Sequence, residues 1–566
     1  MILVPKPHKL ETKEGKLEAR EFKISVDNEA IKYFDTFGGG ELPLNVKKAE
    51  YNDAEKYNIT IDAEGITVEY GDLAAAYRAY TTLTQILASE EVPFLTIEDY
   101  PDIPNRGYMI DISRGKIPNI EYLKELAEIL ADLKYNQLQL YMDSFVYEYA
   151  GFEEYWKDTQ PLTKAEIKEL DAFCKERFIE LVPIQNSFGH MGAWTAKPEI
   201  APLAITDAKG KPSQTLNPLL PGSLELIDKI YAGMLDAFSS DILNIGMDEP
   251  HELGMNETEE VCKEKGVGRV YTEHLNKVID LARDKYGKKV MFFDDIVFKH
   301  PEELANIPKD AVVMQWGYEG EQHFDRNLAL LKSHGLKFYV CPGTSMWGSL
   351  VGRMNNAILN ITQAAESANY YGAEGFLLTE WGDDGHPQFP AITYLPLCVG
   401  GYASWNCGDH ATEVNYQERR ELLTTVKKYL DKFVYNCTSE KSLGDVVYRM
   451  GNAYILEELM FNGTQLVQCI TRRYELTRER LEGFERIAKF GREMRAELDE
   501  VKADAVMLEE CKANCDILIL CCDLLLGRAT KEQHDTVMGE FHRLWELKNH
   551  SVGQDIFADI VKSWVK

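Results

Sequence analysis

Short apolar runs and amphipathic stretches alternate along the chain between residues 106 and 405. The runs have the length of β-strands, and several are almost continuously hydrophobic, as is typical of strands whose two faces are both covered. The stretches between them place apolar residues three and four positions apart, which predicts helices with one buried face. The predicted strands are Gly107–Ile112, Asn136–Met142, Ile179–Gln185, Ile242–Met247, Val290–Asp294, Val312–Trp316, Lys337–Cys341 and Gly375–Thr379.

Eight successive strand and helix units predict an α/β fold of the (β/α)8 TIM barrel type, which we place at residues 101–408. An open doubly wound sheet is the alternative. Eight units would be long for such a sheet, and no glycine-rich phosphate loop follows the first strand. The pattern therefore favours the closed barrel.

A small α/β domain is predicted for residues 1–100, before the barrel. Tyr57–Ile61 and Gly65–Tyr70 alternate between apolar and polar residues as strands do. Leu73–Leu87 then has alanine, leucine and isoleucine at helical spacing.

A helical domain is predicted for residues 409–566, where the strand pattern fades. Long amphipathic stretches such as Ser442–Thr471 and Arg472–Leu508 take over and contain very few prolines. These helices suit packing against the barrel or assembly into a homo-oligomer.

Composition narrows the class of protein. The 566 residues are 45% hydrophobic and 27% charged, as in ordinary globular proteins, and the formal net charge of −30 disfavours nucleic acid as a partner. No apolar run reaches the roughly 18 residues that a membrane-spanning helix needs. The first residues lack the basic-then-apolar layout of a signal peptide, and the 11 irregularly spaced cysteines are typical of reduced thiols. We therefore expect a cytoplasmic protein without a membrane partner.

Acidic and aromatic residues follow the predicted strands, at the end of a barrel where active sites lie. Tryptophan rings stack on the C–H faces of sugars, while carboxylates and arginine bind sugar hydroxyls in pairs. The composition of the predicted mouth thus favours a carbohydrate substrate. The groups concerned include Asp143, His190, Asp248, Glu249, Asp294, Asp295, Trp316, Trp347, Trp381 and Asp383.

Asp248 and Glu249 are adjacent at the end of the fourth predicted strand, and Pro250 then bends the chain away. Glycoside cleavage needs a carboxylic acid that protonates the leaving oxygen and a second group that stabilises positive charge at the anomeric carbon. We expect mutual repulsion and partial burial to raise the pKa of one of these two carboxyls.

Several motifs, in this order, resemble the family 20 glycoside hydrolases, the β-N-acetylhexosaminidases. The resemblance covers residues 106–405 and extends to the small domain before them, notably Gly71 to Leu87. The motifs are Arg106-Gly107-Tyr108-Met109-Ile110-Asp111-Ile112-Ser113-Arg114, Phe188-Gly189-His190, Ile245-Gly246-Met247-Asp248-Glu249, Gln315-Trp316, Pro342 through Trp347, and Trp381-Gly382-Asp383.

The resemblance implies an exo-acting enzyme that removes terminal 2-acetamido-2-deoxy sugars from glycans or glycoconjugates by retaining, substrate-assisted catalysis through an oxazolinium intermediate. It implies that Glu249 is the general acid/base and that Asp248 orients the acetamido group. Arg106 would hold ring hydroxyls, and His190 would lie near the reacting bond. Trp316 and Trp381 would wall the acetamido pocket, and Asp383 would bind outer hydroxyls.

This sequence departs from the family pattern at three places. The loop after the seventh strand usually ends in a tyrosine that grips the acetamido oxygen, whereas Trp347 is the nearest residue here. Phe293 stands where a tryptophan is common, and Met247 replaces the usual glycine before the acidic pair. An indole N–H can donate a hydrogen bond but cannot accept one.

Two other functions stay open at this point. The barrel could be a retaining glycosidase with a protein nucleophile at Asp294, Asp295 or Asp383. It could also be a carbohydrate-binding protein without activity, although the intact Asp248–Glu249 pair disfavours that reading.

No metal or cofactor is expected. Cys511, Cys515 and Cys522 fall on one helical face, with Cys521 beside them, which is more typical of buried thiols than of zinc ligands. A metal site built from His190, His251 and Asp294 or Asp295 is disfavoured because no helix carries two histidines at ligand spacing.

Overall fold

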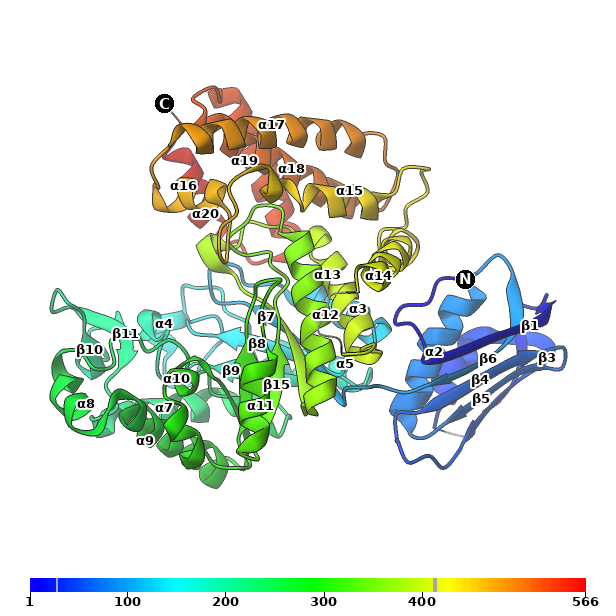
Figure 1. Ribbon diagram of the computed structural model, residues 1–566, viewed down its shortest axis with the longest axis horizontal. Coiled ribbons are helices and arrows are strands. Elements are labelled where there is room, and N and C mark those ends of the chain that lie inside the picture. Colours follow the sequence, from blue (N-terminus) through cyan, green and yellow to red (C-terminus); the bar gives the residue numbers. More distant parts are fainter. Residues whose placement is uncertain (27–28, 411–414, 566) are drawn as a thin grey trace.

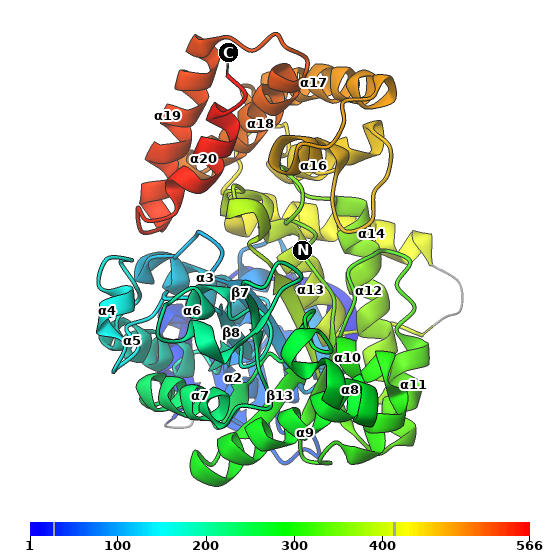
Figure 2. The ribbon, with the colours of Figure 1, turned by 90° about the vertical axis from the view of Figure 1, so that its left-hand side faces the viewer.

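Three parts of the chain pack together in the computed structural model, which describes residues 1–26, 29–410 and 415–565. An N-terminal sheet and a C-terminal group of helices lie against different sides of a central barrel (Figures 1 and 2). The sheet is blue, the barrel runs from cyan to green, and the C-terminal helices are yellow to red.

Eight parallel strands form a closed barrel, which excludes the open sheet. The ring closes where β16 pairs with β7, with Gly375 opposite Asn105. Each strand matches a predicted one to within a few residues at either end. The strands are β7 Asn105–Asp111, β8 Gln137–Met142, β9 Glu180–Gln185, β12 Ile242–Asn244, β13 Lys289–Phe293, β14 Val312–Trp316, β15 Lys337–Cys341 and β16 Gly375–Glu380.

Helices surround the barrel, at least one after each strand, and cover its outer face. Every residue of β8 and β16 is buried, because one face fills the barrel interior and the other packs under helices. A short hairpin, β10 Ala204–Thr206 with β11 Pro212–Leu216, is inserted after β9. The helices are α3 Ile120–Asp132, α5 Lys164–Lys175, α7 Pro221–Met234, α9 Val267–Asp280, α10 Asp295–Lys299, α11 Asp325–Ser333, α12 Met354–Tyr371 and α13 Tyr394–Trp405.

The N-terminal part is a six-stranded mixed sheet with the order β1-β6-β4-β5-β3-β2. Helix α2, Leu73–Leu87, packs on β4 and β5 and begins where the Asp72 side chain accepts a hydrogen bond from the Ala75 amide. The strands and the helix expected at residues 57–87 are confirmed. The strands are β1 Lys9–Leu17, β2 Phe22–Val26, β3 Gly38–Lys48, β4 Tyr57–Asp62, β5 Gly65–Tyr70 and β6 Val92–Asp99.

Arg106 joins the N-terminal sheet to the barrel and does not reach the barrel mouth. It lies at the amino end of β7, is 1% exposed, and donates to the Glu55 carboxylate at 2.8 and 3.0 Å. Its guanidinium also donates to the carbonyl of Lys134 and stacks over Trp405. The expectation that Arg106 binds substrate is therefore wrong, because β7 separates it from the carboxyl ends of the strands by roughly 20 Å.

The C-terminal part is helical, as predicted, but its first stretch is not continuous. Residues 457–464 interrupt the helices expected over Ser442–Thr471, and a short antiparallel bridge joins Met460 to Gly463. The helices are α14 Tyr416–Tyr429, α15 Leu443–Met450, α16 Gln465–Arg472, α17 Arg478–Leu498, α18 Ala505–Leu525, α19 Lys531–Lys548 and α20 Gln554–Lys562.

Buried hydrogen bonds fix the C-terminal helices on the segment that follows β16. The Asn514 side chain accepts from the Phe389 amide, and the Glu510 carboxylate accepts from the Ala391 amide, each at 3.0 Å. Both side chains lie on α18. Among the helices in the described ranges, none is long and apolar enough to cross a membrane.

The buried pair of Arg106 and Glu55 gives a test of the interface between sheet and barrel. Arg106→Met removes the cation and leaves the Glu55 carboxylate without its main partner, so we expect the free energy of unfolding to fall by about 3 kcal/mol. Urea denaturation measures it. Lys9→Met breaks an exposed pair with Glu98 and should cost less than about 1 kcal/mol. Equal effects of the two substitutions would contradict the structural role given to Arg106.

Candidate active site

A cavity of about 360 Å³ opens at the carboxyl ends of the barrel strands. Of the residues predicted to act in catalysis or substrate binding, all line it except Arg106, whereas Asp143, Asp294 and Asp295, also expected at the mouth, do not. Its walls combine carboxylates, aromatic rings and cationic groups. The lining residues are Arg114, His190, Asp248, Glu249, Phe293, Trp316, Tyr318, Trp347, Trp381, Asp383, Asp384, Asn462 and Arg472.

The acidic pair lies on a tight turn after β12. Gly246, Met247 and Glu249 have positive φ values of 68°, 75° and 47°. Such values are costly for residues with a side chain and persist only where the surroundings impose them. The turn buries Asp248, which is 6% exposed, and leaves the Glu249 side chain 38% exposed.

The loop after β9 holds this turn in place. The Asn186 amide donates to Asp248 Oδ1 at 2.8 Å, and the Asn186 side-chain oxygen accepts from the Met247 amide at 3.3 Å. Gly189 packs so closely that a Cβ atom there would lie 2.1 Å from the Asp248 carbonyl oxygen. Only glycine fits this position, which explains why glycine precedes His190.

His190 joins the two carboxylates. Its Nε2 lies 3.3 Å from Asp248 Oδ2 and 3.3 Å from Glu249 Oε2. Burial works to lower the pKa of His190, but the charge and hydrogen bond of Asp248 outweigh it and raise the pKa to about 10. The site therefore carries an imidazolium at neutral pH.

The imidazolium sets the charge of the acidic pair. The hydrogen bond from His190 holds the pKa of Glu249 below its usual range. Burial works to raise the pKa of Asp248, but the charge of His190 and the hydrogen bonds from His190 and Asn186 lower it. We expected repulsion to raise the pKa of Asp248 or of Glu249. In the cavity without a bound sugar this is wrong, because a cation lies between the two carboxylates.

Two further carboxyls lie behind the pair, outside the lining of the cavity. Asp295 accepts from the Glu249 backbone amide at 3.4 Å, and burial followed by the charge of Asp248 raises its pKa to about 7. Asp294 is 2% exposed, and burial next to Asp295 raises its pKa well above the usual range. Asp295 thus supports the acidic turn, and neither residue lines the cavity.

Arg114, and not Arg106 as predicted, is the arginine of this motif that lines the cavity. Its guanidinium donates to Asp111 at 3.1 Å and to Asp383 at 3.0 Å, and it lies over the Trp381 ring at 5.0 Å. Both arginines belong to the same nine-residue motif. The direction of β7 decides between them, because only Arg114 follows the carboxyl end of the strand.

Aromatic rings form the opposite wall. Tyr318 stacks on Trp316 with centroids 5.1 Å apart and meets Trp347 edge-on at 4.9 Å. The Trp381 indole N–H donates to the Tyr318 hydroxyl at 2.9 Å. The sequence places Tyr318 after the sixth strand, two residues beyond Trp316, but no role was predicted for it.

The C-terminal part completes the cavity with two residues that were not predicted from the sequence, Asn462 and Arg472. The Trp347 indole N–H donates to Asn462 Oδ1 at 3.1 Å, so that this donor is already engaged. Arg472, in the last turn of α16, lies 3.9 Å from Asp384. No short motif marks either residue, and no predicted strand leads to them.

Two family models match the chain. The catalytic domain of glycosyl hydrolase family 20 matches residues 104–374, and domain 2 of the same family matches residues 32–100. The chain belongs to glycosyl hydrolase family 20. The match of the catalytic domain ends before β16, so Trp381, Asp383 and the residues from the C-terminal helices are placed by the structure alone.

Curated relatives of this family 20 chain are distant. It is 24% identical over 308 residues to beta-hexosaminidase subunit alpha of Bos taurus, an alignment that covers 50% of this chain and 57% of the relative. It is 28% identical over 230 residues to beta-hexosaminidase of Akkermansia muciniphila, with 36% and 46% covered. The alignments thus span about half the length of these relatives.

Solved family 20 structures share the fold. The chitobiase of Flavobacterium johnsoniae has a TM-score of 0.63 and 16% identity, with 99% of both chains covered. The beta-N-acetylhexosaminidase of Bacteroides fragilis has a TM-score of 0.62 and 17% identity, with 78% of this chain and 98% of that one covered. At identities this low, the structural similarity shows a shared fold and nothing more.

In the described ranges, no group of three or more histidine, cysteine, aspartate or glutamate side chains is arranged to hold a metal ion. The four cysteines of α18 that could have suggested zinc are buried and free. Activity without a metal or cofactor stays a prediction.

The bridge between His190 and the carboxylates predicts how stability depends on pH. A folded-state pKa of about 10, above the usual 6.5, gives a stabilisation that is complete below pH 6.5 and is lost as the pH rises through 10. The difference in unfolding free energy between the wild type and His190→Gln should therefore shrink between pH 6 and pH 10. Urea denaturation at several pH values measures it.

His334→Gln is the control for this measurement. His334 Nδ1 contacts the carbonyl of Leu330 at the end of α11 instead of an acidic pair. We expect its substitution to give a difference that does not shrink over the same pH range. A constant difference for His190→Gln would contradict the imidazolium bridge.

Proposed function

We propose that this protein is an exo-acting β-N-acetylhexosaminidase that removes terminal β-linked N-acetylglucosamine or N-acetylgalactosamine from glycans or glycoconjugates. The observation that carries the proposal is the Asp248–Glu249 pair, joined by His190 in an aromatic cavity. At about 360 Å³ the cavity lies at the lower end of the range for small-ligand sites, which suits one terminal sugar. Membership of family 20 and the names of the relatives support the same activity.

The reaction we propose is substrate-assisted. The acetamido oxygen attacks the anomeric carbon while the bond to the leaving oxygen breaks, and Glu249 gives that oxygen its proton. Water then opens the oxazolinium intermediate as Glu249 takes the proton back, and the configuration is retained. Asp248 stays ionised, held by His190 and Asn186, and faces the positive charge that develops on the acetamido nitrogen.

Glu249 must be protonated when the substrate is bound. It is the more exposed member of the pair, and a sugar that enters the cavity removes water from it, which disfavours the ionised form. Asp248 keeps its two hydrogen-bond partners and stays ionised. Two neighbouring carboxyls with different surroundings can thus take the roles of acid and electrostatic stabiliser.

A protein nucleophile is less well supported. Neither Asp294 nor Asp295 lines the cavity, and Asp383 is engaged by Arg114 at 3.0 Å. A thiazoline inhibitor that mimics the oxazoline distinguishes a protein nucleophile from attack by the acetamido group. Tight inhibition supports participation of the acetamido group, whereas a glycosyl-enzyme trapped on a carboxylate supports the alternative.

Tyr318 supplies a hydroxyl in place of the family's usual tyrosine, for which Trp347 is the nearest residue in this chain. The Tyr318 hydroxyl accepts from Trp381, and we propose that it donates its own proton to the acetamido oxygen of a bound sugar. Arg114 and Asp383 would bind ring hydroxyls. Assembly through the C-terminal helices and a cytoplasmic location stay predictions.

Substitution of the acidic pair tests the proposed function. Glu249→Gln should lower kcat on a disaccharide by about 10³-fold or more, because the leaving oxygen then receives no proton. Asp248→Asn should lower kcat strongly, because it removes a charge with little change of volume. Release of N-acetylhexosamine measures both, and the unfolding transition of each variant controls for folding. Full activity of Glu249→Gln would refute the assignment.

The role of Tyr318 gives a separate test. Tyr318→Phe keeps the ring but removes the hydroxyl, so we expect kcat to fall by about 10²-fold and thiazoline binding to weaken. Tyr339→Phe on β15 is the matched control and should keep kcat within about twofold, because Tyr339 is also buried in the barrel but does not line the cavity. Similar effects of the two substitutions would show that Tyr318 acts only through packing.

A further inference from the structure

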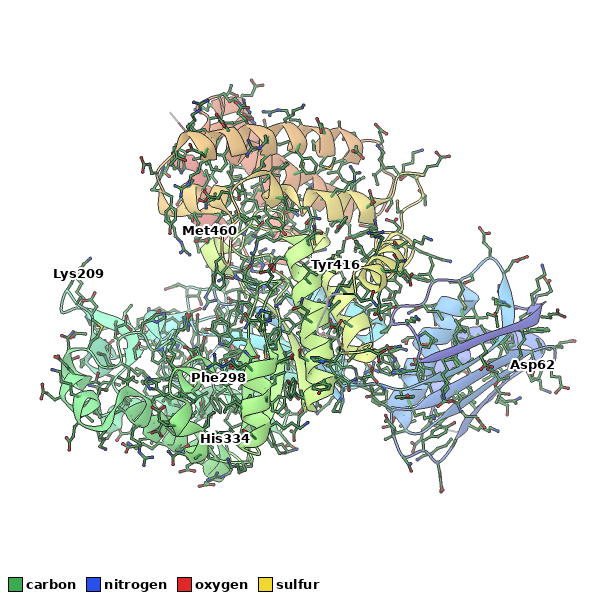
Figure 3. All side chains as sticks on the ribbon, viewed as in Figure 1. Asp62, Lys209, Phe298, His334, Tyr416 and Met460 are labelled. Carbon is green, nitrogen blue, oxygen red and sulfur yellow. The ribbon has the colours of Figure 1, made fainter. Side chains whose placement is uncertain are left out.

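A turn of the C-terminal part brings one side chain, that of Asn462, into the cavity. A bridge between Met460 and Gly463 closes this turn, and Asn462 between them has a φ of 51°. Met460 marks the junction of the C-terminal helices with the barrel in Figure 3. Asn462 lines the cavity but lies beyond residue 374, where the match of the catalytic domain ends. It is thus a feature of this chain outside the part matched by that family model.

Buried charges fix the backbone of Asn462 to the barrel. Its amide donates to Glu319 Oε1 at 2.7 Å, and Arg353 donates to both oxygens of the same carboxylate at 3.0 Å. The Arg353 side chain is only 3% exposed. The place of the Asn462 side chain is therefore set before a substrate binds.

The Trp347 indole decides which end of the Asn462 amide faces it. The oxygen and the nitrogen of an asparagine amide are nearly indistinguishable in shape, so their partners assign them. The indole N–H, 3.1 Å away, can only donate, and the atom opposite it must be the oxygen Oδ1. The NH₂ group therefore lies on the other branch of the amide, away from the indole.

This NH₂ group is a free hydrogen-bond donor. Within residues 1–26, 29–410 and 415–565, no atom accepts a hydrogen bond from Asn462 Nδ2, and the nitrogen is not buried. Because the side chain lines the cavity, the two N–H bonds are available to a ligand there. An NH₂ group cannot accept, so the ligand atom that pairs with it must be an acceptor such as a hydroxyl oxygen.

A terminal N-acetylhexosamine has one polar group that the proposed function leaves without a partner. Glu249 serves the leaving oxygen at C1, and Tyr318 serves the acetamido oxygen at C2. Arg114 and Asp383 serve the ring hydroxyls at C3 and C4. The primary hydroxyl at C6 remains, and its oxygen matches the free donor of Asn462.

We propose that Asn462 donates a hydrogen bond to the C6 hydroxyl of the terminal sugar and is a specificity-determining residue supplied by the C-terminal part. This inference rests on the proposed function. The fixed turn holds the donor in place without a substrate, so that little side-chain freedom is lost on binding. A sugar without the oxygen at C6 leaves the donor unpaired and is the poorer substrate.

Arg472 is the other donor that the C-terminal part adds to the cavity. Its side chain is 55% exposed and lies 3.9 Å from Asp384, an acidic partner on the protein itself. A long exposed arginine also loses more rotamer freedom on binding than a fixed amide does. These differences favour Asn462 as the partner of the C6 hydroxyl.

The test compares substrates with and without the oxygen at C6. Asn462→Gly removes the side chain and keeps the turn, since glycine adopts a positive φ without strain. We expect it to lower kcat/KM about tenfold for the nitrophenyl β-glycoside of N-acetylglucosamine, which loses one hydrogen bond. For the 6-deoxy analogue kcat/KM should stay within about twofold of the wild-type value, because neither enzyme can form that bond.

Asn436→Gly is the matched control. Asn436 also lies in the C-terminal part and has a φ of 48°, but it does not line the cavity. Its substitution should change kcat/KM by less than about twofold for both substrates. The unfolding transition of each variant shows whether it is folded at the assay temperature.

The outcomes separate this inference from the proposed function. Equal losses on both substrates would show that Asn462 acts through packing alone and would overturn the inference, as would no loss on either. A loss confined to the 6-hydroxy substrate in Arg472→Ala, but absent in Asn462→Gly, would overturn it too. In each of these cases the wild type remains a hexosaminidase, whereas a wild type that hydrolyses neither glycoside would refute the proposed function itself.

Discussion

The contact of His190 with Asp248 and Glu249 is the interaction on which the candidate site depends. Two carboxylates on adjacent residues repel each other, and a buried carboxylate loses its hydration. A shared imidazolium 3.3 Å from each offsets both costs. The positive φ values of the acidic turn and the close approach of Gly189 follow from bringing these three side chains into contact.

The three parts of the molecule contribute differently to this arrangement. The barrel supplies the acidic pair, the histidine and most of the aromatic wall from the loops after its strands, which is the usual location of a site in this fold. The C-terminal part closes the cavity through Asn462 and Arg472. The N-terminal sheet is joined through Arg106 and Glu55 at the opposite end of β7 and contributes no side chain to the cavity.

Burial, charge and hydrogen bonding explain why the site differs from what the sequence predicted. The adjacency of Asp248 and Glu249 suggested repulsion, but the pKa of each depends on the cation that a different loop brings between them. Trp347 was expected to face the acetamido group, yet its N–H is engaged by Asn462 from the helical part. The hydroxyl in the cavity comes from Tyr318 instead, held by the Trp381 indole.

The sequence by itself determined the eight strands and the place of Asp248 and Glu249, because both depend on local periodicity and on position after a strand. The sequence also places Arg106 before the first predicted strand and Arg114 after it, so the rule that sites lie at the carboxyl ends of barrel strands already favours Arg114. The places of Asn462 and Arg472 in the cavity were decided only by tertiary structure. They lie more than 200 residues after the acidic pair, and only the packing of the C-terminal helices brings them to the cavity.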